Sequence, residues 1–189
     1  MIKGLDKVLK NLNNVRRELK NNIDTLFIKN SLEWIRDRAI QLLKNNLSFA
    51  PNYFGTEVTD VKEWSIIPTT NKSYILECNY ENSASIEFGI GVVGESNPHP
   101  IAESVGFEYD VPSDSKRADG AWNFIDQNEE IWYNFSGYQG KSFLYNALME
   151  YKQNNVWVKI YQATFDEIMR GVIKWFQILI KKVKKFMKI

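Results

Sequence analysis

Hydrophobic residues recur at three- and four-residue steps over the first part of the chain. The stripe begins at Leu5 and continues to Leu43, and no proline interrupts it before Pro51. This spacing predicts helix over about 4–47. One helix of that length would reach roughly 65 Å at about 1.5 Å per residue, more than the diameter of a small domain. We therefore expect a break at 20–24, where Asn and Asp favour helix caps over helix interiors.

The hydrophobic period changes to that of strands in the middle of the chain. Residues 56–68 and 72–80 are rich in Val, Ile, Trp and Tyr and predict two strands. Residues 69–71 would join these strands as a hairpin. Residues 83–93 predict a third strand and residues 130–137 a fourth.

Polar and proline-rich sequence separates the third predicted strand from the fourth. Residues 94–130 hold three of the five prolines and the polar run "SDSKRADG", a composition typical of a loop. After the fourth strand, Ser142 is placed to cap a helix over 143–154.

The last segment has the sharpest periodicity. Seven apolar residues fall within about 40° of one line at 100° per residue. They are Phe165, Met169, Val172, Phe176, Ile180, Val183 and Met187. Five lysines lie on the other side: Lys174, Lys181, Lys184, Lys185 and Lys188. This pattern predicts an amphipathic helix of about 25 residues with a basic back.

These elements predict an α+β fold. An antiparallel sheet of about four strands would pack against the long N-terminal helical segment and a C-terminal helix. The 189 residues suit one main core. We expect an α+β domain over 1–155 and a basic amphipathic helical extension over 156–189. No run approaches the roughly 18 uninterrupted apolar residues of a membrane span, and the N-terminus has no apolar signal region, so we expect a cytoplasmic protein.

The net charge of +1 conceals a strong segregation. Residues 1–50 hold ten Lys and Arg against five Asp and Glu. Residues 76–130 hold two against twelve, and residues 155–189 hold eight against two. Local balances of +5, −10 and +6 indicate oppositely charged regions that meet within one chain or across copies. The aromatic content of 14% also suits large packed surfaces or subunit contacts.

Known catalytic and cofactor motifs are not found. Gly89, Gly91 and Gly94 imitate a dinucleotide-binding G-x-G-x-x-G, but Glu-Ser-Asn-Pro follows them instead of an opening helix. The single histidine, His99, lies between two prolines and is expected to be a surface loop residue. His99 and Cys78 match no zinc spacing, and Cys78 reads as a small buried hydrophobe. We therefore predict no catalytic, cofactor-binding or metal-binding residues.

Three glutamates on neighbouring predicted strands allow one enzymatic alternative. A glycosidase or nuclease would use a pair of carboxylates such as Glu77 or Glu81 with Glu87. Charges at solvent-facing strand positions also block aggregation. We favour this second interpretation.

Three stretches taken in order resemble a protein family. "GLDKVLKNLNNVRREL", "ENSASIEFGIG" and "GYQGKSFLYNALMEYKQN" resemble the opening helix, the Glu-Phe-Gly turn and the closing helix of the small neck and tail-completion proteins of tailed bacteriophages. This group includes the minor tail protein Z type. The resemblance covers about 1–155. The long loop 95–130 and the helix 156–189 depart from the family's pattern.

The resemblance implies a non-enzymatic structural protein. Many copies would form a ring in the neck or at the top of the tail, joining the tail to the head, with assembly in the host cytoplasm and a final place in the virion. Partners would be other copies and other neck, connector and tail proteins. DNA would be cargo passing through the channel, and no cofactor or stable membrane association is expected. Candidate interface residues are Glu87, Phe88, Gly89, Gly91, Phe143, Leu144, Trp175, Phe176 and Ile180.

Two alternatives remain open at this stage. Glu87 would anchor a contact with a neighbour, or it would form a salt bridge inside its own subunit or be solvated on a strand. The C-terminal helix, with its lysine-rich back and its Trp175 and Phe176 side, also suits a membrane-docking or membrane-active protein.

Overall fold

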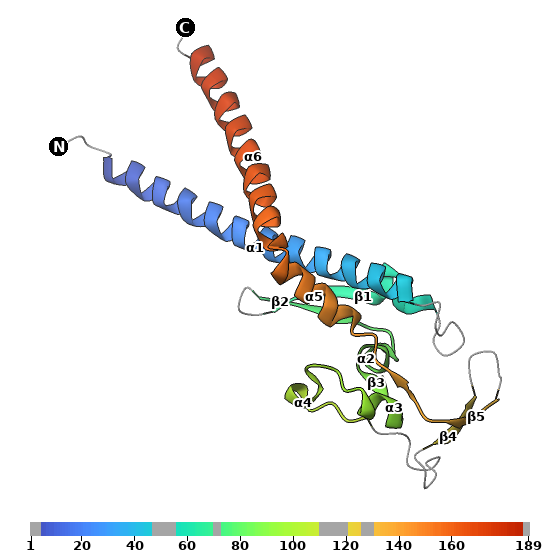
Figure 1. Ribbon diagram of the computed structural model, residues 1–189. Coiled ribbons are helices and arrows are strands. Elements are labelled where there is room, and N and C mark those ends of the chain that lie inside the picture. Colours follow the sequence, from blue (N-terminus) through green and yellow to red (C-terminus); the bar gives the residue numbers. More distant parts are fainter. Residues whose placement is uncertain (1–4, 47–55, 70–72, 110–120, 126–130, 187–189) are drawn as a thin grey trace.

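Two long helices that cross near the middle of the molecule dominate the fold, as the computed structural model in Figure 1 shows. They are α1 (Leu5–Asn46) and α6 (Val156–Phe186). The smaller elements lie together below this crossing in Figure 1. The structure describes residues 5–46, 56–69, 73–109, 121–125 and 131–186.

Helix α1 is continuous, so the predicted break at 20–24 is wrong. Asn and Asp each cost only about 0.7 kcal/mol or less in a helix interior relative to Ala. A break would expose several backbone groups and would cost more than these local preferences. The helix therefore continues through Asn22 and Asp24.

The core gathers around the second half of α1. Its buried side chains pack against the 3₁₀ helix η2 (Thr56–Thr59), strand β1 (Trp64–Pro68) and helix α5 (Phe143–Gln153). The Trp64 indole donates to the carbonyl of Val58 at 3.0 Å and meets the Phe143 ring edge-on at 6.0 Å. The buried core residues are Ile35, Ala39, Ile40, Leu43, Val58, Trp64, Ile86, Phe143 and Ala147.

The predicted hairpin is confirmed, in shorter form. Strand β1 pairs antiparallel with β2 (Tyr74–Cys78), from Trp64 opposite Cys78 to Pro68 opposite Tyr74. The residues before β1 form η2 and a second 3₁₀ helix, η3 (Val61–Glu63), instead of strand. Most of the predicted turn, 70–72, lies outside the described residues.

The predicted third strand over 83–93 is wrong. The chain forms helix α2 (Ser83–Phe88), the two-residue strand β3 (Gly89–Ile90) and helix α3 (Gly91–Ser96). Ile86 and Glu87 are adjacent and both buried, which a helical turn allows and a half-buried strand does not. A short alternation of apolar and polar residues therefore gave the wrong period here.

The described strands form three separate antiparallel pairs, so the predicted sheet of about four strands is wrong, although the α+β class holds. Strand β3 pairs with β6 (Tyr138–Gln139). The predicted fourth strand is present as β5 (Ile131–Phe135), which pairs with β4 (Trp122–Ile125). Strand β4 and the short helix α4 (Ala102–Val105) both lie within the predicted loop 94–130.

Helices α5 and α6 run antiparallel to α1. They are separated by Asn154 and by Asn155, whose φ of 50° is left-handed. The rings of Trp34 and Tyr151 lie 5.9 Å apart, and the Tyr151 hydroxyl donates to Ser31 at 2.8 Å. These contacts fix α5 along the middle of α1.

The first turns of α6 also contact α1. The rings of Phe27 and Tyr161 meet edge-on at 5.4 Å, and the Asn30 amide donates to the Thr164 hydroxyl at 3.0 Å. Beyond these contacts the two helices diverge (Figure 1). We call their diverging parts the α1 arm (residues 5–26) and the α6 arm (residues 165–186).

Candidate functional site

A buried carboxylate lies at the junction of α2, β3 and α5. Glu87 is in the last turn of α2, and its side chain is 9% exposed. Its Oε2 accepts the backbone N–H of Leu144, and its Oε1 accepts that of Tyr145, each at 2.9 Å. These groups belong to the first turn of α5, whose N–H groups have no partner within the helix. Glu87 therefore caps α5 from 57 residues earlier in the sequence.

The negative charge of Glu87 is well placed for this role. The N-terminus of a helix carries a partial positive charge, which favours a carboxylate. The residue at the N-cap position, Ser142, has a left-handed φ of 48° and makes no side-chain capping bond. The prediction that Ser142 caps this helix through its side chain is therefore wrong, although the helix begins where it was expected.

His99 supplies the third contact to the carboxylate. Its Nε2 lies 3.1 Å from Oε1 of Glu87, and its Nδ1 accepts the N–H of Ile101 at 3.3 Å. Because Nδ1 accepts, we assign the proton to Nε2, which donates to Glu87. The His99 side chain is 0% exposed, so the prediction of a surface histidine is wrong.

Aromatic rings enclose the imidazole. Phe88 lies 4.4 Å from the His99 ring, and Tyr145 meets it edge-on at 5.3 Å. Phe107 stacks on the other partner, Phe88, at 4.4 Å, and the Tyr109 hydroxyl accepts the N–H of His99 at 2.7 Å. The Glu87–His99 pair is thereby held away from water.

Glycines let the backbone close over this pair. Gly140 runs so near α2 that a Cβ there would lie 2.3 Å from the carbonyl oxygen of Glu87. A Cβ on Gly137, whose φ is 95°, would lie 1.9 Å from the carbonyl oxygen of Ile90. Gly89 has a φ of 93°, which bulkier residues resist. The predicted sharp turn at Gly89 is confirmed.

Strands β3 and β6 join the two motifs that carry the family resemblance. Gly89 lies opposite Gln139 and Ile90 opposite Tyr138. Two further backbone bonds follow, from Lys141 to the carbonyl of Ile86 and from Ser142 to that of Glu87. The Glu-Phe-Gly turn and the start of the closing helix are thus one structural unit.

The candidate interface residues fall into two groups. Glu87, Phe88, Gly89, Gly91, Phe143 and Leu144 gather around this junction, inside one chain. Glu87 is buried at 7% exposure and Phe143 at 2%, and Gly91 donates to the carbonyl of Tyr109. For Glu87, the structure shows the pairing inside the subunit. Phe176 lies on the α6 arm and is 50% exposed, whereas the side chains of Trp175 and Ile180 lie outside the described residues.

The chemistry of the junction is structural. Three donors satisfy the carboxylate, which stabilises a buried charge without leaving a site for a substrate. Glu77 and Glu81, the other members of the predicted glutamate group, are exposed. Among the described residues no group of three or more His, Cys, Asp or Glu is placed to hold a metal ion. Cys78 is half-buried, and burial raises the pKa of its thiol.

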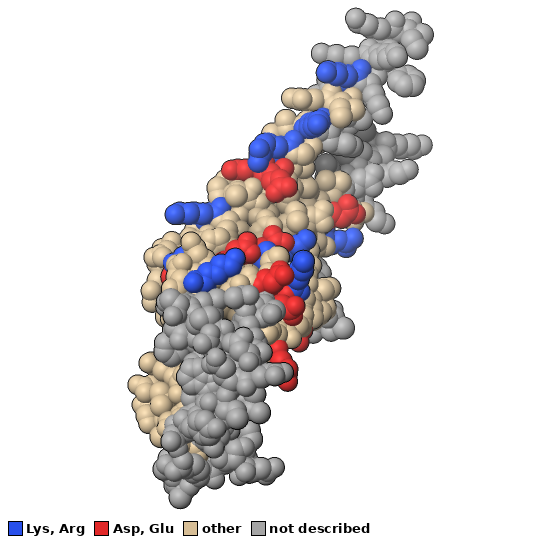
Figure 2. Space-filling model, turned by 90° about the vertical axis from the view of Figure 1, so that its right-hand side faces the viewer, with Lys and Arg blue, Asp and Glu red and all other residues tan. Residues whose placement is uncertain are grey.

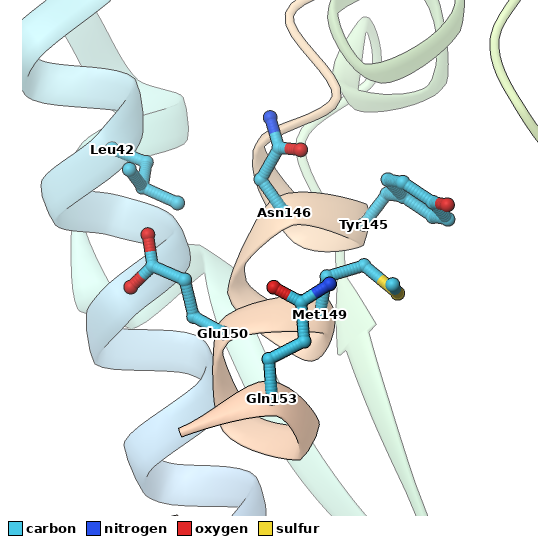
Figure 3. A pocket seen from close by; sticks show the side chains of 6 residues that line it. All are labelled: Leu42, Tyr145, Asn146, Met149, Glu150 and Gln153. Atoms are coloured by element: carbon cyan, nitrogen blue, oxygen red, sulfur yellow. The ribbon is translucent and has the colours of Figure 1, made fainter.

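An open groove of about 440 Å³ lies between α1 and α5 (Figure 3). It is lined by Leu42, Tyr145, Asn146, Met149, Glu150 and Gln153. Arg38 donates two hydrogen bonds to the Glu150 carboxylate beside it, at 2.6 and 2.9 Å. These bonds lower the pKa of Glu150 and raise that of Arg38. The groove contains no further charged side chain.

Charged side chains are mixed over the face shown in Figure 2. Lys and Arg lie beside Asp and Glu over the middle of the molecule, and basic side chains continue upward along the projecting part. No described helix is both long enough and apolar enough to cross a membrane. Comparisons with family models, with curated proteins and with solved structures found no match to this chain.

Proposed function

We propose that this chain is a structural component of a tailed phage or phage-like particle. Copies would form a ring in the neck or at the top of the tail, complete the tail and join it to the head. The observation that carries the proposal is the junction of the two resemblance motifs. The Glu-Phe-Gly turn at 87–89 and the segment 137–144 pair through β3 and β6, and Glu87 caps the helix that follows.

The remaining features support a role in assembly. The best-formed polar pair, Glu87 and His99, is sealed inside the chain and links elements distant in sequence. The projecting arms offer apolar side chains for contacts between proteins. Partners are other copies and other neck, connector and tail proteins, with DNA passing through the channel. The proposal includes no enzymatic activity and no cofactor, and places the protein in the virion after assembly in the host cytoplasm.

The test is deletion of the gene from the phage or prophage that carries it. Particles assembled without the protein should accumulate as separate heads and tails in electron micrographs, and the supplied gene should restore joined particles. We expect the isolated protein to associate weakly, because such contacts often mature only against neighbouring layers. Normal infectious particles from the deletion strain would refute the proposal.

The α6 arm supports a second candidate function, docking on an anionic membrane surface. Phe165 and Ile173 are exposed on a helix that also carries Arg170 and Lys174, a combination found in interfacial helices. Co-sedimentation with anionic vesicles tests it, comparing the full chain with a chain ending at residue 160. Membrane docking requires that the full chain binds and that the shortened chain, still folded, does not.

A further inference from the structure

The α6 arm presents apolar side chains that its own chain leaves exposed. Phe165 is 37% and Ile173 52% exposed. Helix α6 contacts α1 through Tyr161 and Thr164 instead. At 100° per residue, that side lies roughly 110° around the helix from Phe165 and Ile173. The packing on α1 therefore leaves this side of the arm uncovered.

Basic side chains flank these apolar side chains. Arg170 and Lys174 are both exposed on the α6 arm. Over its whole length, Val156–Phe186, helix α6 holds seven Lys and Arg against two Asp and Glu. We define the arm surface as Phe165, Arg170, Ile173 and Lys174.

The region around α4 has the opposite charge. The described segment 73–109 holds six Glu and neither Lys nor Arg. Ile101 is 38% and Val105 57% exposed. They lie one turn apart, because the N–H of Val105 donates to the carbonyl of Ile101 at 3.2 Å.

Glutamates accompany these two apolar residues. Glu103 lies between them in the sequence, Glu108 follows, and both are exposed. We define the α4 surface as Ile101, Glu103, Val105 and Glu108. It combines exposed apolar side chains with negative charge, as the arm surface combines them with positive charge.

The two surfaces lie at opposite ends of the molecule. In Figure 1 the α6 arm projects upward from the helix crossing, whereas α4 lies below it. The arm of a chain therefore does not reach the α4 surface of the same chain. A contact between the two surfaces requires two copies.

We propose that the arm surface of one copy docks on the α4 surface of a second copy. Burial of apolar side chains would supply most of the affinity, and the opposite charges would set the orientation. The alternative pairing of arm with arm brings two basic helices together. Head-to-tail contacts of this kind close into a ring when the rotation between copies permits. The inference deepens the proposed function and rests on it for the requirement that copies meet.

The first experiment is sedimentation velocity over a range of protein concentrations. The full-length protein should show concentration-dependent association, which Ile173→Asp and Val105→Asp should each abolish. Ile75→Asp is the matched control, because Ile75 is also 52% exposed but belongs to β2. Circular dichroism verifies that each variant is folded. Monomers at every concentration, or equal loss of association in the control, would overturn the inference.

A mixing experiment separates head-to-tail from symmetric contacts. Each of the two variants retains one intact surface, so an equimolar mixture should form dimers and nothing larger. An arm-to-arm interface gives no such rescue, because the Val105→Asp variant alone would then still associate. Raising the salt concentration should weaken the dimer, because screening acts over about 10 Å at 0.1 M salt.

Two further outcomes identify what has failed. A monomeric protein that binds anionic vesicles, and loses that binding with Ile173→Asp, would replace the second copy with a membrane. Particles that need the gene but assemble normally with Ile173→Asp would reject this interface and leave the proposed function standing. Joined particles from the deletion strain, together with dimers in the mixture, would reject the function and leave the interface standing.

Discussion

The carboxylate of Glu87 lies 3.1 Å from Nε2 of His99, and neither side chain is more than 9% exposed. The two residues hold three parts of the fold together. Glu87 ends α2 and caps α5, and His99 belongs to the segment between α3 and α4. Buried polar contacts of this kind cost more when broken than they contribute when formed, because the partner is left unsatisfied.

Removal of the carboxylate should destabilise the fold strongly. Glu87→Ala leaves two helix N–H groups and the imidazole N–H without their acceptor, at about 1–3 kcal/mol for each buried unsatisfied group. We expect the free energy of unfolding, measured with urea, to fall by about 3 kcal/mol or more. Glu81→Ala is the matched control, because Glu81 is exposed, and it should change stability by less than about 0.5 kcal/mol. Equal effects of the two variants would contradict the capping role.

The contribution of His99 should depend on Glu87. His99→Phe retains a ring against Phe88 but removes the donor to the carboxylate and the acceptor for Ile101. We expect a loss of about 1–3 kcal/mol. A double-mutant cycle with Glu87→Gln measures the coupling, which should be about 0.5–3 kcal/mol for residues in contact. Additive effects of the two substitutions would show that the pair does not interact.

Substitutions of glycine should have opposite effects at two positions. Gly140→Ala places a Cβ against backbone atoms of Glu87 and Phe88, at 2.3–2.6 Å, so the strands β3 and β6 must move apart. We expect thermal unfolding at a clearly lower temperature. Gly171 lies within α6 with no atom near its added Cβ, and Gly171→Ala should stabilise the helix by about 0.5–1 kcal/mol. A stable Gly140→Ala protein would contradict this close approach.

Gly89 should be less tolerant than its neighbour Ser85. Its φ of 93° is a conformation that β-branched residues resist, and an added Cβ would lie 2.6 Å from the backbone nitrogen of Gly140. Gly89→Val should therefore lower the yield of folded protein and of assembled particles more than Ser85→Val does. Soluble expression and particle counts measure the two effects. A Gly89→Val variant that equals Ser85→Val in both would contradict the requirement for glycine.

Local periodicity was sufficient for the elements that depend on nearby residues. The helices α1 and α6, the β1–β2 hairpin and the start of α5 were predicted because each pattern extends over several turns or residues. The segment around Glu87 was too short for this, and the six residues of α2 fit a strand pattern equally well. The actual period is set by Gly89 and by the packing of Ile86 into the core.

The Glu87–His99 contact could not be predicted from sequence patterns. His99 lies between two prolines in a polar segment, and its burial depends on Phe88, Phe107 and Tyr145. Glu87 caps a helix that begins 56 residues later, so no local capping motif reports it. Both facts arise from tertiary packing. The glycines at 137 and 140 were the available signal, since close backbone approach is one reason for glycine.

The pairing of Arg38 with Glu150 predicts a pH-dependent contribution to stability. Two hydrogen bonds from the guanidinium lower the pKa of Glu150 below its ordinary value of 4.5. A carboxyl group with a lower pKa in the folded chain stabilises the fold above its unfolded-state pKa. That contribution is lost as the pH falls through the folded-state pKa. The side chains are 28% and 33% exposed, so solvent screening reduces the effect.

We therefore expect Glu150→Gln to lower the free energy of unfolding at pH 7 by about 0.5–1 kcal/mol. The difference from the unmodified protein should shrink below pH 4.5, because protonation then removes the same charge from Glu150. Urea unfolding at a series of pH values measures this. Glu33→Gln serves as the control, since Glu33 meets Lys29 at 3.9 Å with both side chains at least 40% exposed, and its effect should be smaller at every pH. A Glu150→Gln difference that is the same at pH 7 and in acid would show that the charge of Glu150 contributes nothing, and that its contact with Arg38 acts through packing alone.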